Sequence, residues 1–212
     1  ILDIGESVEV MENRGEWSQV LYNGETGYIR SEYLSTEKKI ENEHLIVIDA
    51  GHQAHGNSEQ EPIGPGASQT KAKVASGTTG RTTGVTEYQL NLDVALKLRD
   101  ELEARGYEVY MIRETNDVDI SNAERAQLAA ESGSDILIRI HANGSDNTSV
   151  AGALTMAPST ANPYLSQEMI AECQKLSQCI ITAFCASTGA NNQGVYQTDE
   201  MSGLNWCSIP AT

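Results

Sequence analysis

Three short apolar runs mark the buried strands that this chain is expected to contain. The first, Leu45–Ile48, consists of four consecutive apolar, mostly β-branched residues, and the others fall within Tyr107–Ile112 and Asp135–Ile140. Such runs are typical of strands in a sheet that helices cover on both faces. The first run stops at Asp49, and His52 follows where the strand gives way to a loop.

The pattern between these runs predicts helices. Thr86 to Arg105 is the clearest, because Thr86-x-x-Gln89 has the form of a capping box and Gly106 is a suitable terminator. Apolar residues recur along it at helical spacing and predict its inward face, at Leu90, Val94, Leu98 and Leu102. Glu87 lies seven residues before Val94, which places its carboxylate on or beside that face.

The later part of the chain continues the alternation. Ser121-x-x-Glu124 is a second capping box and opens a helix that runs to about Glu131, and Val150–Ala157 suggests a further strand. Asn162-Pro163 predicts the start of a long helix, and another strand begins at Ile209–Thr212. The apolar stripe of the long helix reads Met169, Cys173, Leu176, Ile180 and Phe184.

The N-terminal residues follow a different pattern. Residues 1–36 predict short strands joined at Asn23-Gly24, the strongest short hairpin signal. Residues 37–44 form a polar linker, and residues 45–212 form the main domain. Strand, helix, strand, helix, strand is the order of parallel βαβ units. We therefore expect an α/β fold, with a mixed, mostly parallel sheet flanked by helices, preceded by a small β fragment.

Two histidines and one glutamate are placed to meet at one edge of the sheet. His52 and His141 each follow a predicted strand, and Glu87 begins the helix that follows the first loop. Each has an ordinary explanation alone, such as a solvated loop histidine or a glutamate favoured by the helix dipole. Together they form the His-His-Glu set of a catalytic zinc site, which leaves a fourth position for water. The intervening residues 53–85 read as a long Gly-, Ser- and Thr-rich loop, in which His55 is a weaker candidate.

Composition narrows the choice of function. The 212 residues are 39% hydrophobic and 21% charged, which indicates a globular chain. Fourteen Lys and Arg against 30 Asp and Glu give a net charge of −16, which disfavours nucleic-acid binding. No apolar run approaches the length of a membrane span. The chain starts at Ile1 without Met and without a signal peptide, so we read it as a processed or excised fragment whose export signal, if it had one, is gone.

The cysteines do not suggest a structural metal site. None of the four forms a Cys-x-x-Cys pair, and we favour buried free thiols over disulfides. They are Cys173, Cys179, Cys185 and Cys207.

Several motifs in order resemble one known family, the zinc-dependent N-acetylmuramoyl-L-alanine amidases of type 3. They are Val47–His52, Thr86–Asn91, Met111–Arg113, Glu124-Arg125 and Ile140–Asn143. The resemblance implies that Zn²⁺ is held by the two histidines and the glutamate just named. It further implies an extracellular, cell-wall-associated enzyme, a monomer, that hydrolyses the amide between N-acetylmuramate and L-alanine in peptidoglycan.

The N-terminal strands resemble part of a bacterial SH3-like module, a companion of cell-wall hydrolases. The matching phrases are Gly15–Val20, Asn23–Ile29 and Ser31–Leu34. The opening strands of that module have no counterpart here, so we read residues 1–36 as a partial module.

One element of the amidase pattern is not found before Thr212. In the family a glutamate on the last core strand, shortly after an Ile-Pro segment, is the general base, and we expect it after Thr212 with the rest of that strand. Glu200 is a weak substitute because its surroundings do not match the motif. Arg125 and Asn143 are candidate substrate contacts, with a structural salt bridge and a turn residue as alternatives. Arg113 is read as structural.

Three other functions compete with this reading. The main alternative is a zinc-containing but inactive cell-wall-binding or regulatory protein, and the missing glutamate favours it. Another zinc amide hydrolase, such as a carboxypeptidase, is a second. A nucleotide-binding protein is disfavoured because no Gly-x-Gly-x-x-Gly follows the first strand.

Overall fold

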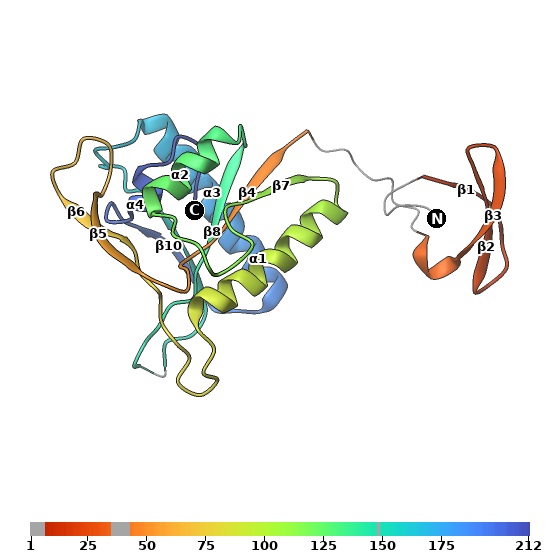
Figure 1. The fold of residues 1–212 in the computed structure, drawn as a ribbon, viewed down its shortest axis with the longest axis horizontal. Coiled ribbons are helices and arrows are strands. Elements are labelled where there is room, and N and C mark those ends of the chain that lie inside the picture. Colours follow the sequence, from red (N-terminus) through yellow and green to blue (C-terminus); the bar gives the residue numbers. More distant parts are fainter. Residues whose placement is uncertain (1–6, 35–42, 148) are drawn as a thin grey trace.

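The computed structural model describes residues 7–34, 43–147 and 149–212 (Figure 1). In the first range, β1 (Glu9–Asn13), β2 (Trp17–Tyr22) and β3 (Glu25–Arg30) form an antiparallel sheet in that order, followed by the 3-10 turn Ser31–Tyr33. Positive φ angles of 50° at Asn23 and 84° at Gly24 make the predicted hairpin turn. Residues 1–6 and 35–36 of the SH3-like segment and 37–42 of the expected linker lie outside the described residues.

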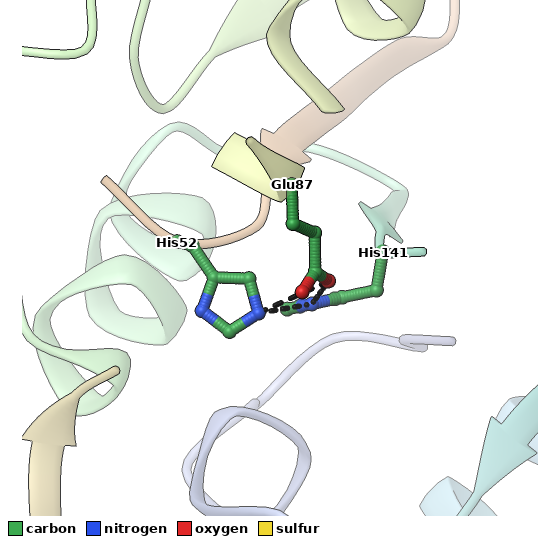
Figure 2. A group of neighbouring side chains, drawn as sticks. All are labelled: His52, Glu87 and His141. Carbon is green, nitrogen blue, oxygen red and sulfur yellow. Dashed lines mark hydrogen bonds and ion pairs between the residues drawn. The ribbon is translucent and has the colours of Figure 1, made fainter. Parts of the chain in front are cut away.

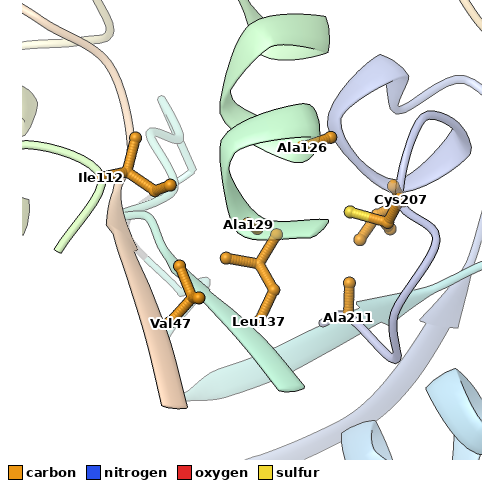
Figure 3. Close-up of a cluster of buried hydrophobic side chains, with 8 residues drawn as sticks. Val47, Ile112, Ala126, Ala129, Leu137, Cys207 and Ala211 are labelled. Atoms are coloured by element: carbon orange, nitrogen blue, oxygen red, sulfur yellow. The ribbon is translucent and has the colours of Figure 1, made fainter. Parts of the chain in front are cut away.

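The main sheet is built on β4 (Leu45–Ala50), which pairs in parallel with β7 (Glu108–Met111) and β8 (Ile136–Ile140). This confirms the expected parallel arrangement. Side chains alternate between the faces of β4: Ile46 and Ile48 pack towards helix α1 (Glu87–Ala104), whereas Val47 packs towards α2 (Asn122–Glu131). Figure 3 shows the cluster on the α2 side of the sheet, which contains Val47. The continuous apolar run exists because both faces of the strand are covered.

Helix α1 presents a different face to the sheet from the predicted one. Leu90 and Val94 are 42% and 43% exposed, whereas Asn91 and Ala95 are buried. The inward stripe therefore begins at Glu87 and continues through Asn91 and Ala95 to Leu98 and Leu102. The predicted inward face was wrong at Leu90 and Val94. The buried positions there belong to the carboxylate of Glu87 and the amide of Asn91, which apolar periodicity cannot mark.

The predicted capping box of α1 is also absent. Thr86 makes no side-chain cap hydrogen bond; its backbone pairs with Thr79 in an isolated antiparallel bridge. The Gln89 side chain instead donates to Asp93 and accepts from Asn116. The end of the helix follows the prediction, since Gly106 adopts a φ of 86°.

The other two long helices were placed with mixed success. The capping box of α2 is present as predicted, with Ser121 and Glu124 bonded reciprocally. Helix α3 (Gln167–Thr188) is capped by Ser166 and does not start at Asn162, whose amide donates to Asp199 and Asn205 instead. Its predicted stripe was mostly wrong, and Phe184 is 50% exposed. The buried residues of α3 are Ile170, Cys173, Ser177 and Ile181.

The region read as a long loop contains a β-hairpin, β5 (Asn57–Pro62) paired with β6 (Thr70–Val74). Its strands were missed because they are polar and mostly exposed, and only Glu61 and Val74 are buried within them. The hairpin matters for the site, because the chain returns from it at Ala75 directly beside His52.

The remaining strands are β9 (Ala153–Ala157) and β10 (Asn192–Gln197), which pair in parallel and pack against α3. After the short helix α4 (Ser202–Asn205), Ala211 pairs in parallel with Leu137 of β8, as the predicted start of a strand requires. All four cysteines are free; Cys173 and Cys207 are buried and Cys179 is exposed. Within the described ranges, we find no helix with the length and apolarity of a membrane span.

Candidate metal centre

His52 enters the site from the turn that follows β4. Its backbone has a φ of 63°, a left-handed conformation that few non-glycine residues adopt. Its Nδ1 lies 2.8 Å from the carbonyl oxygen of Ala75, to which it donates. This bond fixes the tautomer, so that Nε2 carries a free lone pair and faces the site, as in histidines that bind metals. The polar hairpin thus supplies, through Ala75, the support for this histidine.

Glu87 is the first residue of α1, and its side chain is only 6% exposed. The backbone N–H of Thr78 donates to Oε2 at 3.0 Å, and that of Ala142 donates to Oε1 at 3.1 Å. Burial opposes ionisation of the carboxyl, but the hydrogen bonds from His141 and these N–H groups outweigh it and lower the pKa of Glu87 to about 2. The carboxylate is therefore charged at any physiological pH.

His141 follows β8 directly, and its ring packs against the backbone of Gly51. A Cβ atom at Gly51 would collide with the His141 ring, so only glycine leaves room for it. Gly77 plays a similar part beside His52 and Glu87, at a φ of 82°. Desolvation lowers the pKa of His141 below its ordinary value, which favours the neutral imidazole that binds metals.

The three side chains converge as the sequence predicts (Figure 2). His52 Nε2 lies 3.1 Å from Glu87 Oε1 and 3.1 Å from His141 Nδ1, and His141 Nδ1 lies 3.3 Å from Glu87 Oε1. Ligand atoms at about 2.0 Å from a tetrahedral ion are separated by about 3.3 Å, so these distances fit such an ion. Nε2 of His52 and the Glu87 oxygen are both acceptors, and they repel each other unless a cation or a proton lies between them. The donor set therefore fits a divalent metal ion.

Arg125 lies behind this site rather than in it. It is fully buried and pairs with Asp49 at 2.6 Å, while Arg139 approaches the other oxygen of Asp49 at 2.9 Å. Its five hydrogen bonds match the five N–H groups of a guanidinium, which leaves none for a substrate. The structural salt bridge, the alternative weighed above, is thus the one observed. Burial opposes ionisation of Asp49, but the two arginines lower its pKa to about 2.

The other sequence candidates fall in different places. Asn143 is exposed two residues after His141, in the loop that follows β8. His55 is exposed and does not belong to the ligand group found among the described residues, and neither does Glu200, an exposed residue between β10 and α4. Arg113 is buried and bonded to backbone carbonyls, as a structural residue should be. No sequence pattern marked Ala75, because its contribution is a backbone carbonyl in a polar segment.

Comparisons with known proteins agree with this geometry. The N-acetylmuramoyl-L-alanine amidase family model matches residues 46–212, and a bacterial SH3 domain model matches residues 2–35. N-acetylmuramoyl-L-alanine amidase LytC of Bacillus subtilis (strain 168) is 30% identical over 112 residues. The match covers 53% of this chain but only 21% of LytC, so the chain spans about a fifth of that relative.

Solved structures share the fold. The N-acetylmuramyl-L-alanine amidase Ami1 from Mycobacterium smegmatis superposes with a TM-score of 0.70 at 22% identity, over 81% of this chain and 80% of its own. The N-acetylmuramoyl-L-alanine amidase from Clostridium difficile 630 gives a TM-score of 0.60 at 24% identity, over 79% and 76% of the two chains. At these identities the likeness establishes the α/β fold with its flanking helices.

Proposed function

The chain belongs to the N-acetylmuramoyl-L-alanine amidase family, and from this premise we propose that it is a zinc-dependent peptidoglycan hydrolase. The bond cleaved is the amide between N-acetylmuramic acid and the L-alanine of the stem peptide. The observation that carries the proposal is the convergence of His52, Glu87 and His141 at one edge of the sheet. Two imidazoles and one carboxylate form the ligand set of catalytic zinc sites.

In this proposal His52 Nε2, Glu87 Oε1 and His141 Nδ1 hold Zn²⁺. When bound there, the ion supplies an activated water, whose pKa falls from about 15.7 towards 7, and polarises the amide carbonyl. The chain's own residues prepare the site: Ala75 orients the His52 ring, while Thr78 and Ala142 hold the Glu87 carboxylate ionised. The single charge of that carboxylate leaves the bound ion with net positive charge, as polarisation of a carbonyl requires.

We propose that the general base follows Thr212. The N–H of Leu137 donates to Pro210 O at 2.9 Å and that of Arg139 donates to Thr212 O at 2.9 Å, so this segment runs parallel to β8 towards His141. A strand that continued in this register would come level with His141 about three residues after Thr212. A glutamate there would reach the water at the metal and take its proton.

Two further assignments complete the proposal. Asn143, exposed beside the metal centre, is proposed as a hydrogen-bonding contact to the muropeptide. Residues 1–36 are proposed as a partial SH3-like module joined through residues 37–44 to a catalytic domain at 45–212. We propose that the chain acts at the cell wall, because peptidoglycan is extracellular. We further propose that it acts as a monomer and that the substrate is its main partner.

The test combines metal content with hydrolysis. The chain 1–212 and a form that continues beyond Thr212 are purified, their zinc is measured by elemental analysis, and released stem peptides with a free N-terminal L-alanine are measured from muropeptides. We expect one zinc per chain in both forms and hydrolysis that depends on the continuation. His52→Ala should lose the zinc, whereas the matched control His55→Ala should keep it.

The same measurement separates the alternatives. Zinc without hydrolysis in both forms would favour an inactive wall-binding or regulatory protein. Cleavage between amino acids of the stem peptide, with the lactyl amide intact, would indicate a carboxypeptidase. No zinc in the wild-type chain would overturn the ligand assignment.

A further inference from the structure

Gly51 is a backbone point at which the segments of all three proposed ligands meet. Its N–H donates to Ile140 O at 2.9 Å, next to the third ligand, and the His141 ring packs where its side chain would be. Its carbonyl accepts two buried hydrogen bonds, from Asn91 Nδ2 and from Arg113 Nη2, both at 3.1 Å. A shift of this carbonyl would therefore be felt at both histidines.

Arg113 connects this point to the helix that carries the glutamate. Its side chain is buried, and Nε donates to Ala50 O at 2.7 Å. Nη2 donates to Gly51 O at 3.1 Å and to Tyr88 O at 2.8 Å. Ala50 and Gly51 directly precede the first histidine ligand, and Tyr88 directly follows the carboxylate ligand. One planar guanidinium thus spans the backbones of two ligand-bearing segments that lie far apart in the sequence.

The charge of Arg113 has no counterion among these contacts. Its remaining nitrogen, Nη1, donates to Thr115 O and Asn116 Oδ1, so every acceptor that the described residues offer it is neutral. Burial, together with the nearby Arg125, lowers the pKa of Arg113 to about 10. A buried cation is costly unless its hydrogen bonds offset the lost hydration. The guanidinium of Arg113 therefore acts as a rigid, planar donor that holds several backbone carbonyl groups in fixed positions.

The segment held in this way needs a constraint. His52 has a left-handed φ of 63°, a sparsely populated conformation that persists where surrounding structure over-determines it. The hydrogen bonds to the carbonyls of Ala50 and Gly51, the two residues before it, fix the direction from which His52 enters the site. Arg125 adds a weaker contact to His52 O at 3.2 Å.

We propose that Arg113 is a positioning residue of the metal centre: with Asn91 it holds the Gly51 carbonyl and sets the distance between His52 and Glu87. The inference rests on the proposed function, because it requires a metal at those ligands. Loss of this guanidinium lets the two ligand segments move independently, which lowers metal affinity even where the fold survives. Lysine cannot replace it, since one ammonium cannot reach Ala50, Gly51 and Tyr88 in a fixed plane.

The test measures metal affinity separately from stability in the full chain. Zn²⁺ affinity is measured by competition with a chelating dye, and the visible spectrum of the Co²⁺-loaded protein reports the coordination number. We expect Arg113→Lys to weaken Zn²⁺ binding on the order of 10- to 100-fold, the range for loss of an outer-shell partner. Its Co²⁺ spectrum should lose intensity, because displacement of His52 opens the site to additional water ligands and raises the coordination number.

A matched control is Ile181→Val in the buried face of α3, which lowers stability at a site away from the Arg113 contacts and should leave the spectrum unchanged. Wild-type affinity and spectrum at folded Arg113→Lys would overturn the inference. If Arg113→Lys does not fold, Asn91→Ala decides: a several-fold weaker affinity supports the hold on Gly51, and an unchanged one overturns it. A wild-type chain without zinc affinity would instead refute the proposed function, so the two failures are distinct.

Discussion

Helices α1 and α2 cover opposite faces of the same sheet, and each buries one charged side chain near its start. On α1 this is Glu87, whose Oε1 lies within 3.3 Å of a nitrogen of each histidine. On α2 it is Arg125, whose guanidinium is enclosed by Asp49 at 2.6 Å and by backbone carbonyls. The charge on α2 is matched by a carboxylate within the protein, whereas the charge on α1 faces the ring nitrogens of two histidines.

The helix ends differ in the same sense. At α2, Glu124 N donates to Ser121 Oγ at 3.2 Å, and Ser121 N donates to Glu124 Oε2 at 2.7 Å. At α1 the same spacing of residues closes no such box, and the first carboxylate instead accepts N–H groups from Thr78 and Ala142 of two loops. At α2 the helix start forms its hydrogen bonds within its own first turn, and these bonds stabilise the helix. At α1 the carboxylate of Glu87 is held by N–H groups of other segments, and it is therefore available for a site.

The largest expected effect comes from Glu87→Ala. Loss of one of three ligands should weaken metal binding by well over the roughly 100-fold that an outer-shell partner contributes. Equilibrium dialysis against a metal buffer measures it. The matched change on α2, Glu124→Ala, should keep the metal, and comparable metal loss in both variants would refute the contrast between the two helix starts.

Arg125→Met is expected to act on stability. It leaves the buried Asp49 with Arg139 alone, and the removal of one member of a buried ion pair costs about 3–5 kcal/mol. Urea unfolding of the metal-free chain measures the loss. The double variant Asp49→Ala, Arg125→Met should recover part of it, because no uncompensated carboxylate remains.

The pH dependence should sharpen the assignment of Asp49. Its pKa falls from 3.8 in the unfolded chain to about 2 in the folded protein, so its ionised form stabilises the fold above pH 3.8. As the pH falls from 3.8 through 2 this contribution, about 2 kcal/mol, is lost. Unfolding curves of the metal-free wild type should show this decline, and Asp49→Asn should flatten it. An equal slope in both proteins would contradict the assignment.

Ser121→Ala should cost about 1 kcal/mol, the usual value for loss of an N-cap side chain. Thermal unfolding of the metal-free chain is the measurement. The variant should retain metal affinity, since the box lies outside the ligand set.

The smallest effect is expected for Thr86→Ala. Thr86 occupies the equivalent position at α1 but makes no side-chain cap bond, so the stability change should stay within about 0.5 kcal/mol. A loss equal to that of Ser121→Ala would show that the two helix starts are alike in solution.

The sequence by itself determined the parallel strands of the main sheet and the convergence of His52, Glu87 and His141. The apolar run at Leu45–Ile48 is dictated by burial on both faces, and histidines at the ends of two parallel strands meet at one edge whatever the details of packing. Glu87 could be placed beside them because it opens a helix that begins at that edge. These conclusions depend on local periodicity and on the order of elements, which a single chain displays.

Only the tertiary structure decided which faces and which polar atoms serve the site. Periodicity marked Leu90 and Val94 as buried, but Asn91 is inside because its amide meets the carbonyl of Gly51. The hairpin that delivers Ala75 is polar along most of its length, and Arg113 reads like any arginine after a strand. Ala75 and Arg113 act through hydrogen bonds that involve backbone carbonyls distant in sequence. Because every residue has such a carbonyl, no sequence pattern predicts these contacts.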